Sequence, residues 1–262
     1  MRPLPLFLGL LGAASLSSCG FVRVPHVTAR TYVLVHGALL GEFSWQRVER
    51  RLVADGNTVI TLDLPGHDAD QTPADKISLD DYKNAVIQAI GNRTNVILVG
   101  HSFGGVVVSQ VAEAVPDKIS KLVYLAALIP QNGESANDLS AMDKNSLFGK
   151  YVTVTPTALV FNPAGVEPVF CNDCTPEDVA LLQSRLRPEP LKPFATPVHL
   201  TPERYGRVPK YDILTAKDNA VSSAFQQTLK ARLNPQGSFV IDSSHVPFLT
   251  QPDELTRILE SL

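Results

Sequence analysis

One pentapeptide constrains the fold of this 262-residue chain more than any other feature. Residues 100–104 (GHSFG) follow the apolar run 96–99 and precede a helical pattern that ends before Pro116. A Gly-x-Ser-x-Gly sequence between a buried strand and a helix is typical of a nucleophile elbow, a sharp turn that presents the serine hydroxyl. The flanking glycines are needed because side chains there would collide with neighbouring backbone. Ser102 is therefore the candidate nucleophile, with an ordinary structural turn as the alternative.

Five further apolar runs alternate with amphipathic helical patterns. The runs cover residues 32–35, 58–62, 121–126, 210–215 and 238–242. Short apolar strands that alternate with helices are typical of a parallel sheet covered on both faces. We therefore predict an α/β fold with a mostly parallel, doubly wound six-stranded sheet, in a domain that spans residues 31–262.

The alternation stops between residues 130 and 209, where 11 of the 20 prolines fall. Proline disfavours long helices and long strands. The segment nevertheless carries aromatic residues of the kind that proteins bury: Phe148, Tyr151, Phe161, Phe170 and Phe194. We predict that residues 130–209 form a cap inserted over the carboxyl ends of the strands, rather than a disordered linker.

The first 19 residues have the layout of an export signal. Arg2 precedes the apolar run 4–14, which is far shorter than the roughly 20 residues of a membrane-spanning helix. Residues 16–19 (LSSC) resemble a bacterial lipobox, and a lipid on Cys19 would anchor the mature protein to a membrane. We predict an exported bacterial protein, periplasmic or membrane-anchored. A signal peptide without lipidation and a mis-set start codon are the alternatives.

The second and third cysteines, Cys171 and Cys174, are separated by two residues in a C-x-x-C pattern. Outside the cytoplasm they could form a local disulfide, and two free core thiols are the alternative. No second cysteine pair is present to complete a zinc site. We assign the pair no catalytic role and predict no metal.

A serine hydroxyl needs a base, and the base needs an acid. In a fold with this elbow the order along the chain is serine, acid, histidine, with the histidine after the last strand. His245 follows the run 238–242, and Asp218 follows the run 210–215. The other nearby carboxylates fit less well, because Asp212 lies within a strand and Asp242 at a strand end. The predicted triad is Ser102, Asp218 and His245.

Two backbone amides are expected to bind the oxyanion. One belongs to Phe103, directly after the nucleophile, and the other to Ala38, in the loop after the first strand. We expect His36 to be a buried prop of that loop. Apolar residues beside these loops, together with the cap aromatics, are expected to form a pocket for an uncharged hydrophobic substrate. The predicted pocket residues are Leu39, Leu40, Val246 and Phe248.

These stretches resemble the α/β-hydrolase superfamily, in the branch of plant methylesterases, plant hydroxynitrile lyases and many bacterial esterases. The matching segments are 33–38 (VLVHGA), 63–67 (DLPGH), 98–105 (LVGHSFGG), 215–225 and 244–248 (SHVPF). The resemblance implies the α/β-hydrolase fold, the same triad and the same two amides. The lyases resemble each other in a threonine where this chain has Gly37, and in a lysine where it has Val246. The resemblance therefore favours an esterase.

We predict a serine hydrolase that cleaves carboxylic esters of small hydrophobic substrates through an acyl-enzyme, without a metal or organic cofactor. The alternatives are a carbon–carbon or cyanohydrin lyase, a lactone or thioester hydrolase, and a non-enzymatic ligand-binding module. The formal net charge of −3 gives no reason to expect a nucleic-acid partner. The sequence indicates neither the physiological substrate nor the oligomeric state.

Overall fold

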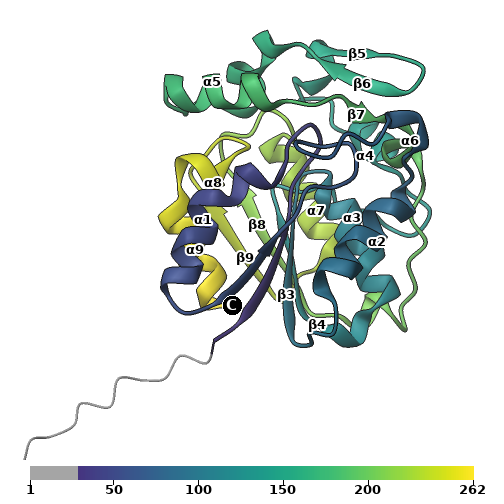
Figure 1. Ribbon diagram of the computed structural model, residues 1–262, viewed down its shortest axis with the longest axis vertical. Coiled ribbons are helices and arrows are strands. Elements are labelled where there is room, and N and C mark those ends of the chain that lie inside the picture. The colour runs from purple at the N-terminus through teal and green to yellow at the C-terminus, as the bar shows by residue number, and fades with distance from the viewer. Residues whose placement is uncertain (1–28) are drawn as a thin grey trace, which may run out of the picture.

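The computed structural model describes residues 29–262, so the predicted leader and Cys19 lie outside the described residues. Its main sheet has six strands in the order β2-β1-β3-β4-β8-β9, and all neighbouring strands are parallel (Figure 1). The strands are β1 (Thr31–Val35), β2 (Thr58–Thr61), β3 (Val96–His101), β4 (Ile119–Leu125), β8 (Lys210–Thr215) and β9 (Gly237–Ile241). The predicted six-stranded parallel sheet is confirmed. The winding reverses between β1 and β3, where open α/β sheets bind ligands at their carboxyl ends.

The sheet separates two hydrophobic cores, because alternate side chains of a strand point to opposite faces. In β1, Val33 packs into the core beneath one helical layer and Leu34 into the other. The first layer contains α2 (Leu79–Ile90), α3 (Gly104–Ala114) and α7 (Ser223–Leu233). The second contains α1 (Gln46–Ala54), α8 (Pro247–Thr250) and α9 (Pro252–Ser261). Burial on both faces explains why the strands are apolar runs rather than alternating ones.

Local sequence signals explain where the helices begin and end. The Ser78 hydroxyl accepts a hydrogen bond from the amide of Asp81, whose carboxylate accepts one from the amide of Ser78. This capping box satisfies backbone donors that the first turn of α2 leaves free. The helix ends at Gly91, which has a φ of +58°. The helix after the elbow, α3, ends two residues before Pro116, as the missing amide of proline requires.

Residues 130–209, here called the cap, lie between β4 and β8 and cross the top of the main sheet in Figure 1. Its elements are short, as expected for a segment rich in proline. They are α4 (Ala136–Met142), α5 (Pro176–Arg185), α6 (Leu191–Ala195) and a small antiparallel sheet of β5 (Val152–Val154), β6 (Ala158–Phe161) and β7 (Glu189–Pro190).

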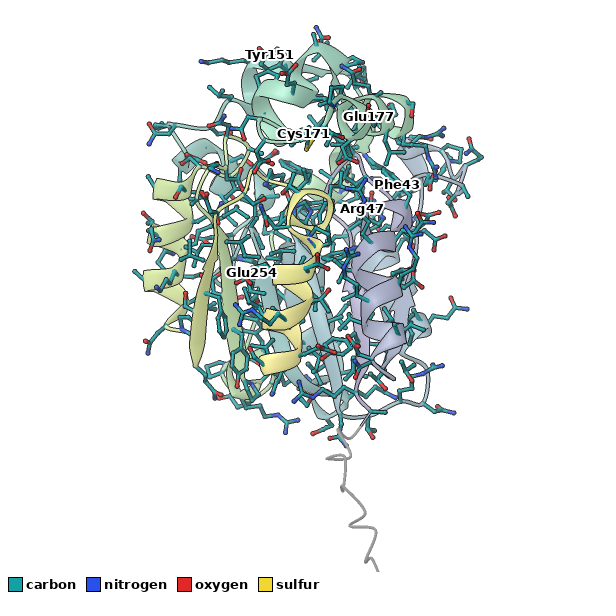
Figure 2. The ribbon with its side chains drawn as sticks, turned by 90° about the vertical axis from the view of Figure 1, so that its left-hand side faces the viewer. Phe43, Arg47, Tyr151, Cys171, Glu177 and Glu254 are labelled. Carbon is teal, nitrogen blue, oxygen red and sulfur yellow. A yellow bond between two sulfur atoms is a disulfide. The ribbon has the colours of Figure 1, made fainter. Side chains whose placement is uncertain are left out.

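Ion pairs join the cap to the rest of the protein. Arg47 of α1 contacts the carboxylate of Asp178 in α5 at 2.5 Å and 3.0 Å. Arg185, near the end of α5, pairs with Asp68 in the loop after β2. Figure 2 shows Cys171 on the side of the cap that faces the main sheet, with Tyr151 on the far side. Throughout residues 29–262, every helix is too short or too polar to cross a lipid bilayer.

Candidate active site

Ser102 stands on a sharp turn between β3 and α3, in the left-handed backbone region with a φ of +53°. The glycines around it are required by close contacts. A Cβ atom on Gly100 would lie 2.7 Å from the carbonyl oxygen of Gly104, and a Cβ atom on Gly104 would lie 2.6 Å from that of His36. A side chain on Gly100 would therefore push α3 away from β3, and one on Gly104 would push the turn away from the end of β1. The strained geometry presents the Ser102 hydroxyl above the sheet.

The carboxylate of Asp218 lies in the loop after β8 and is almost fully buried. One oxygen, Oδ1, accepts hydrogen bonds from the amides of Ala220 at 2.8 Å and Val221 at 3.0 Å. The other, Oδ2, accepts hydrogen bonds from Thr215 Oγ1 and Gln226 Nε2, both at 2.8 Å. Four donors around one carboxylate hold it in a single orientation.

His245 lies in the loop after β9, and its Nδ1 is 2.7 Å from Oδ2 of Asp218. Because an ionised carboxylate only accepts, Nδ1 carries the proton and Nε2 is left as the basic nitrogen. The backbone carbonyl of His245 is 2.8 Å from Nε2 of His101. Burial holds the pKa of His101 well below its ordinary value, so this ring is neutral and donates to the carbonyl. His101 therefore supports the loop of His245 and does not act as a base.

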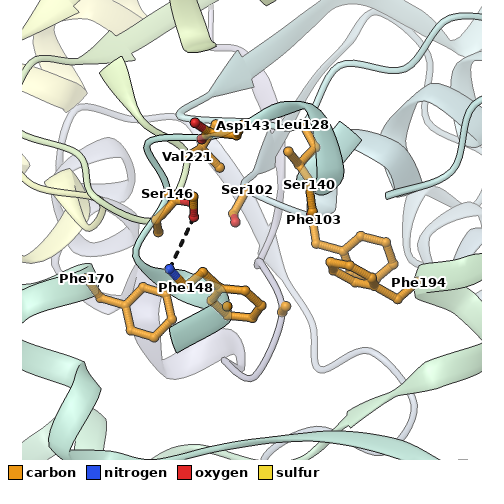
Figure 3. A pocket seen from close by; sticks show the side chains of 13 residues that line it. Ser102, Phe103, Leu128, Ser140, Asp143, Ser146, Phe148, Phe170, Phe194 and Val221 are labelled. Carbon is orange, nitrogen blue, oxygen red and sulfur yellow. Dashed lines mark hydrogen bonds between the residues drawn. The ribbon is translucent and has the colours of Figure 1, made fainter. Parts of the chain in front are cut away.

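A cavity of about 180 Å³ opens beside Ser102, and Figure 3 shows the serine hydroxyl pointing into it. Its walls are mainly apolar, with four aromatic rings and three small residues. One side is polar and is formed by Ser140, Asp143 and Ser146. The other lining residues are Ala38, Phe103, Leu128, Phe148, Gly149, Phe170, Phe194, Ala220 and Val221. The ring of Phe170 also lies 5.6 Å from that of His245, centroid to centroid. His245 is thus adjacent to the wall of the cavity that holds Ser102.

The loop after β1 meets the elbow at Gly37, where a Cβ atom would lie 2.7 Å from the Cβ of Ser102. Ala38 lines the cavity with Ser102 and Phe103. His36 is fully buried, and burial lowers its pKa to about 3. Its Nε2 accepts a hydrogen bond from the amide of Leu64 at 3.0 Å, and its Nδ1 donates to the carbonyl of Gly37 at 2.8 Å. His36 is therefore a neutral prop of this loop, as predicted.

A family model described as "Alpha/beta hydrolase family" matches residues 32–258. The chain belongs to the alpha/beta hydrolase family. A putative chloroplastic methylesterase of Arabidopsis thaliana is 31% identical over 246 residues, which are 88% of this chain and 71% of that protein. Methyl jasmonate esterase 1 of Vitis vinifera is 29% identical over 251 residues, which are 89% of this chain and 96% of that protein. A solved Arabidopsis methylesterase superposes with a TM-score of 0.76 at 29% identity, covering 88% of this chain and 97% of that one.

This hydrolase-family chain departs from expectation at the four predicted pocket residues. Leu39, Leu40, Val246 and Phe248 are buried in the core between the main sheet and α1, α8 and α9, and none of them lines the cavity. Phe248 packs on Trp45 with ring centroids 5.2 Å apart. These side chains pack in the buried core because large apolar groups are most stable where they exclude water completely. The cap aromatics take their place in the cavity wall.

The two rival carboxylates lie away from His245. Asp212 is buried within β8, and its Oδ2 has no hydrogen-bond partner among the described residues. Asp242 is exposed and forms an ion pair with Lys217 at 2.8 Å. Among residues 29–262, no three His, Cys, Asp or Glu side chains gather as a metal site. The Cys171–Cys174 pair forms a disulfide, which decides between the two states that the sequence left open.

The sequence did not indicate Gln226 and Glu189, which donate or accept hydrogen bonds that support the site. Gln226 lies on α7, eight positions after Asp218, and only the start of a helix directly after the acid loop could have drawn attention to it. Glu189 lies between two prolines in the cap, with no local signal at all. Its fully buried carboxylate accepts a hydrogen bond from the amide of Leu39 at 3.1 Å. Contacts of this kind join segments far apart in the chain and leave no periodic pattern.

Proposed function

We propose that this chain is a serine hydrolase that cleaves carboxylic esters of small hydrophobic acids through an acyl-enzyme. One observation carries the proposal: the Asp218–His245 hydrogen bond is adjacent to an apolar cavity whose wall contains the strained Ser102. Family membership and the esterase names of the relatives support the reaction type. The aromatic lining supports an uncharged substrate, because a desolvated charge among aromatic rings would be unfavourable.

In the proposed first step, Ser102 Oγ attacks the ester carbonyl carbon while Nε2 of His245 takes its proton. The imidazolium that forms is stabilised by Asp218, whose carboxylate four other donors hold in place. The negative charge on the former carbonyl oxygen is stabilised by the amides of Ala38 and Phe103. When the tetrahedral intermediate collapses, His245 returns the proton to the leaving alcohol and the acyl group remains on Ser102.

In the second step, a water molecule replaces the alcohol. His245 takes a proton from this water, whose oxygen attacks the acyl carbon, and the same two amides stabilise the second oxyanion. Collapse releases the carboxylic acid and returns the proton to Ser102 Oγ. The cycle needs only groups of this chain and one water molecule.

The lyase alternative requires a cation close to the leaving group. At the position that follows His245 this chain has Val246, which is apolar and buried in the core. No charge therefore reaches the cavity from that position, and we keep ester hydrolysis as the proposed reaction.

Active-site labelling tests the proposal directly. A fluorophosphonate should react with Ser102, identified by peptide mapping, and the same sample should hydrolyse part of a panel of methyl and short-chain esters. Ser102→Ala should remove the label and lower kcat by about 10⁴-fold or more, because the nucleophile is absent. Equal turnover by the parent and the variant would rule out a serine mechanism. A tight-binding but unhydrolysed ester would instead favour the ligand-binding module.

We also propose that the chain is exported and carries a lipid on Cys19, on the strength of its leader sequence. The Cys171–Cys174 disulfide supports export, because such bonds persist mainly outside reducing compartments. Mass spectrometry of the mature amino terminus, after detergent partitioning of the cells, tests both statements. An intact Met1 terminus would contradict export, and an unmodified cleaved terminus would contradict lipidation.

A further inference from the structure

The C-x-x-C segment has a place in the molecule that the proposed reaction does not explain. Cys171 is buried in the core beneath the cap, and its disulfide to Cys174 closes a loop around Asn172 and Asp173. The cap side of the protein thus carries one covalently closed turn, which faces the main sheet (Figure 2). A closed loop of this size restricts the backbone of the two enclosed residues.

Each enclosed residue contacts one of the two loops that carry the acid and the base. Asn172 Nδ2 donates a hydrogen bond to the carbonyl oxygen of Lys217 at 2.9 Å. Asp173 Oδ2 accepts a hydrogen bond from the amide of Ser244 at 3.0 Å. Lys217 directly precedes Asp218 and Ser244 directly precedes His245. The closed turn therefore binds both loops one residue before the side chains that form the Asp218–His245 pair.

The residue directly before the disulfide-closed turn also contacts the imidazole of His245. Phe170 directly precedes Cys171, and its ring packs against that of His245 while lining the cavity. Asp218 has its own network of donors, so its position depends only partly on the turn. The loop of His245 depends on it more, because Asp173 is the side chain that receives the Ser244 amide. Loosening the turn should displace the base more than the acid.

We propose that the Cys171–Cys174 disulfide makes residues 170–174 a redox-sensitive clamp, in which Asn172 and Asp173 are positioning residues for the triad loops. A dithiol reductant opens the clamp: the S–S bond breaks, two thiols form with two electrons and two protons from the dithiol, and the dithiol becomes a cyclic disulfide. The effect of the clamp on catalysis rests on the function proposed above. The clamp itself rests on the contacts and holds whether or not esters are the substrate.

The test compares oxidised and reduced protein in the full chain with Cys19→Ser, which leaves only the two clamp cysteines. Thiols are counted by mass spectrometry after alkylation. Hydrogen–deuterium exchange is then followed in the peptide around residues 243–246, with the peptide of α2 as internal control. Reduction should speed exchange at Ser244 about tenfold or more and leave α2 unchanged, because only the local structure opens. Reoxidation should restore protection.

Kinetics on an ester give the second readout. Reduction should lower kcat by about tenfold with little change in KM, because a small displacement of the base slows proton transfer without emptying the pocket. Cys171→Ser/Cys174→Ser should behave like the reduced protein and be insensitive to the reductant. The oxidised Asp173→Ala variant should also have the lower kcat of the reduced protein. Asp173→Asn should keep a kcat near that of the parent, since an amide oxygen still accepts a hydrogen bond from Ser244.

The outcomes separate the two proposals. Equal exchange at Ser244 in oxidised and fully reduced protein overturns the clamp, whatever the activity. Faster exchange with an unchanged kcat overturns its role in catalysis. An oxidised protein that neither hydrolyses esters nor takes up a fluorophosphonate overturns the proposed function, and the exchange comparison then still decides the clamp.

Discussion

Glu189 Oε2 lies 2.9 Å from Nε2 of His67, and both side chains are fully buried. Glu189 comes from β7 of the cap, and His67 from the loop after β2. The other carboxylate oxygen accepts a hydrogen bond from the hydroxyl of Tyr82 at 3.0 Å. Burial by itself lowers the pKa of His67, but the charge of Glu189 and the hydrogen bond to it outweigh this and raise the pKa above its ordinary value. The same carboxylate receives the amide of Leu39, which directly follows Ala38.

The first prediction concerns this buried pair. Glu189→Ala should lower kcat about tenfold, because no side-chain oxygen then holds the backbone next to Ala38, the proposed oxyanion donor. It should also destabilise the fold by about 3–5 kcal/mol, since His67 loses its partner in the interior. Urea unfolding and steady-state kinetics measure the two effects. Glu203→Ala, at an exposed position of the cap, is the matched control and should change neither. An unchanged kcat would contradict the positioning of the loop by Glu189.

The second prediction concerns Asp218, the proposed triad acid. Asp218→Asn should lower kcat by about 10⁴-fold while the protein stays folded, because an amide cannot both accept from Nδ1 of His245 and stabilise the imidazolium. The asparagine oxygen can still accept from the amides of Ala220 and Val221. Circular dichroism checks the fold, and ester hydrolysis checks the rate. Asp242→Asn, on the exposed rival carboxylate, should retain nearly full activity. A large loss of kcat in Asp242→Asn and a small one in Asp218→Asn would instead assign the acid to Asp242.

The third prediction is a pH dependence of stability. Burial raises the pKa of Asp212 to about 7, against an ordinary value of 3.8, and its Oδ2 lacks a partner among the described residues. The folded state therefore binds a proton that the unfolded state releases between these pH values, and stability falls as pH rises from about 4 to 7. Above pH 7 the free energy of unfolding is lower by up to about 4 kcal/mol than at pH 4.

Asp212→Asn should remove this loss, because an amide stays neutral at every pH. Urea unfolding at pH 5, 7 and 9 should show that the free energy of unfolding of the variant rises relative to that of the parent as pH rises. The difference should be largest at pH 9. Asp117→Asn, which affects only an exposed ion pair with Arg207, should change stability by less than about 1 kcal/mol. A constant difference between parent and Asp212→Asn across this range would contradict the raised pKa.

The fourth prediction concerns the cavity wall. Phe148 lines the cavity and stacks on Phe161 with ring centroids 5.5 Å apart. Phe148→Ala should raise KM for hydrophobic esters roughly tenfold or more, because about 1.5–3 kcal/mol of apolar contact is lost. It should also let the enzyme accept bulkier acyl groups. A series of esters with increasing acyl size measures both effects. Val154→Ala, at an exposed cap position, should leave the series unchanged.

Some features of this protein follow from short stretches of sequence alone. The apolar runs predicted the six strands, and the GHSFG turn identified Ser102, because strand burial and tight turns depend on residues that are neighbours in the chain. The order of the strands then indicated Asp218 and His245, which lie hydrogen-bonded at the rim of the sheet. A parallel sheet brings the ends of its strands to one edge, so position along the chain was sufficient.

The tertiary structure alone decided which side chains line the cavity and what holds the loops. Leu39 and Val246 are the sequence neighbours of Ala38 and His245 but are buried in the core, whereas Phe148 and Phe194 of the irregular cap line the cavity. A loop has no repeating period, so its sequence does not show which way each side chain points. The contacts of Glu189 and of the Cys171–Cys174 turn likewise join distant segments, and only the packing of the cap on the sheet brings them together.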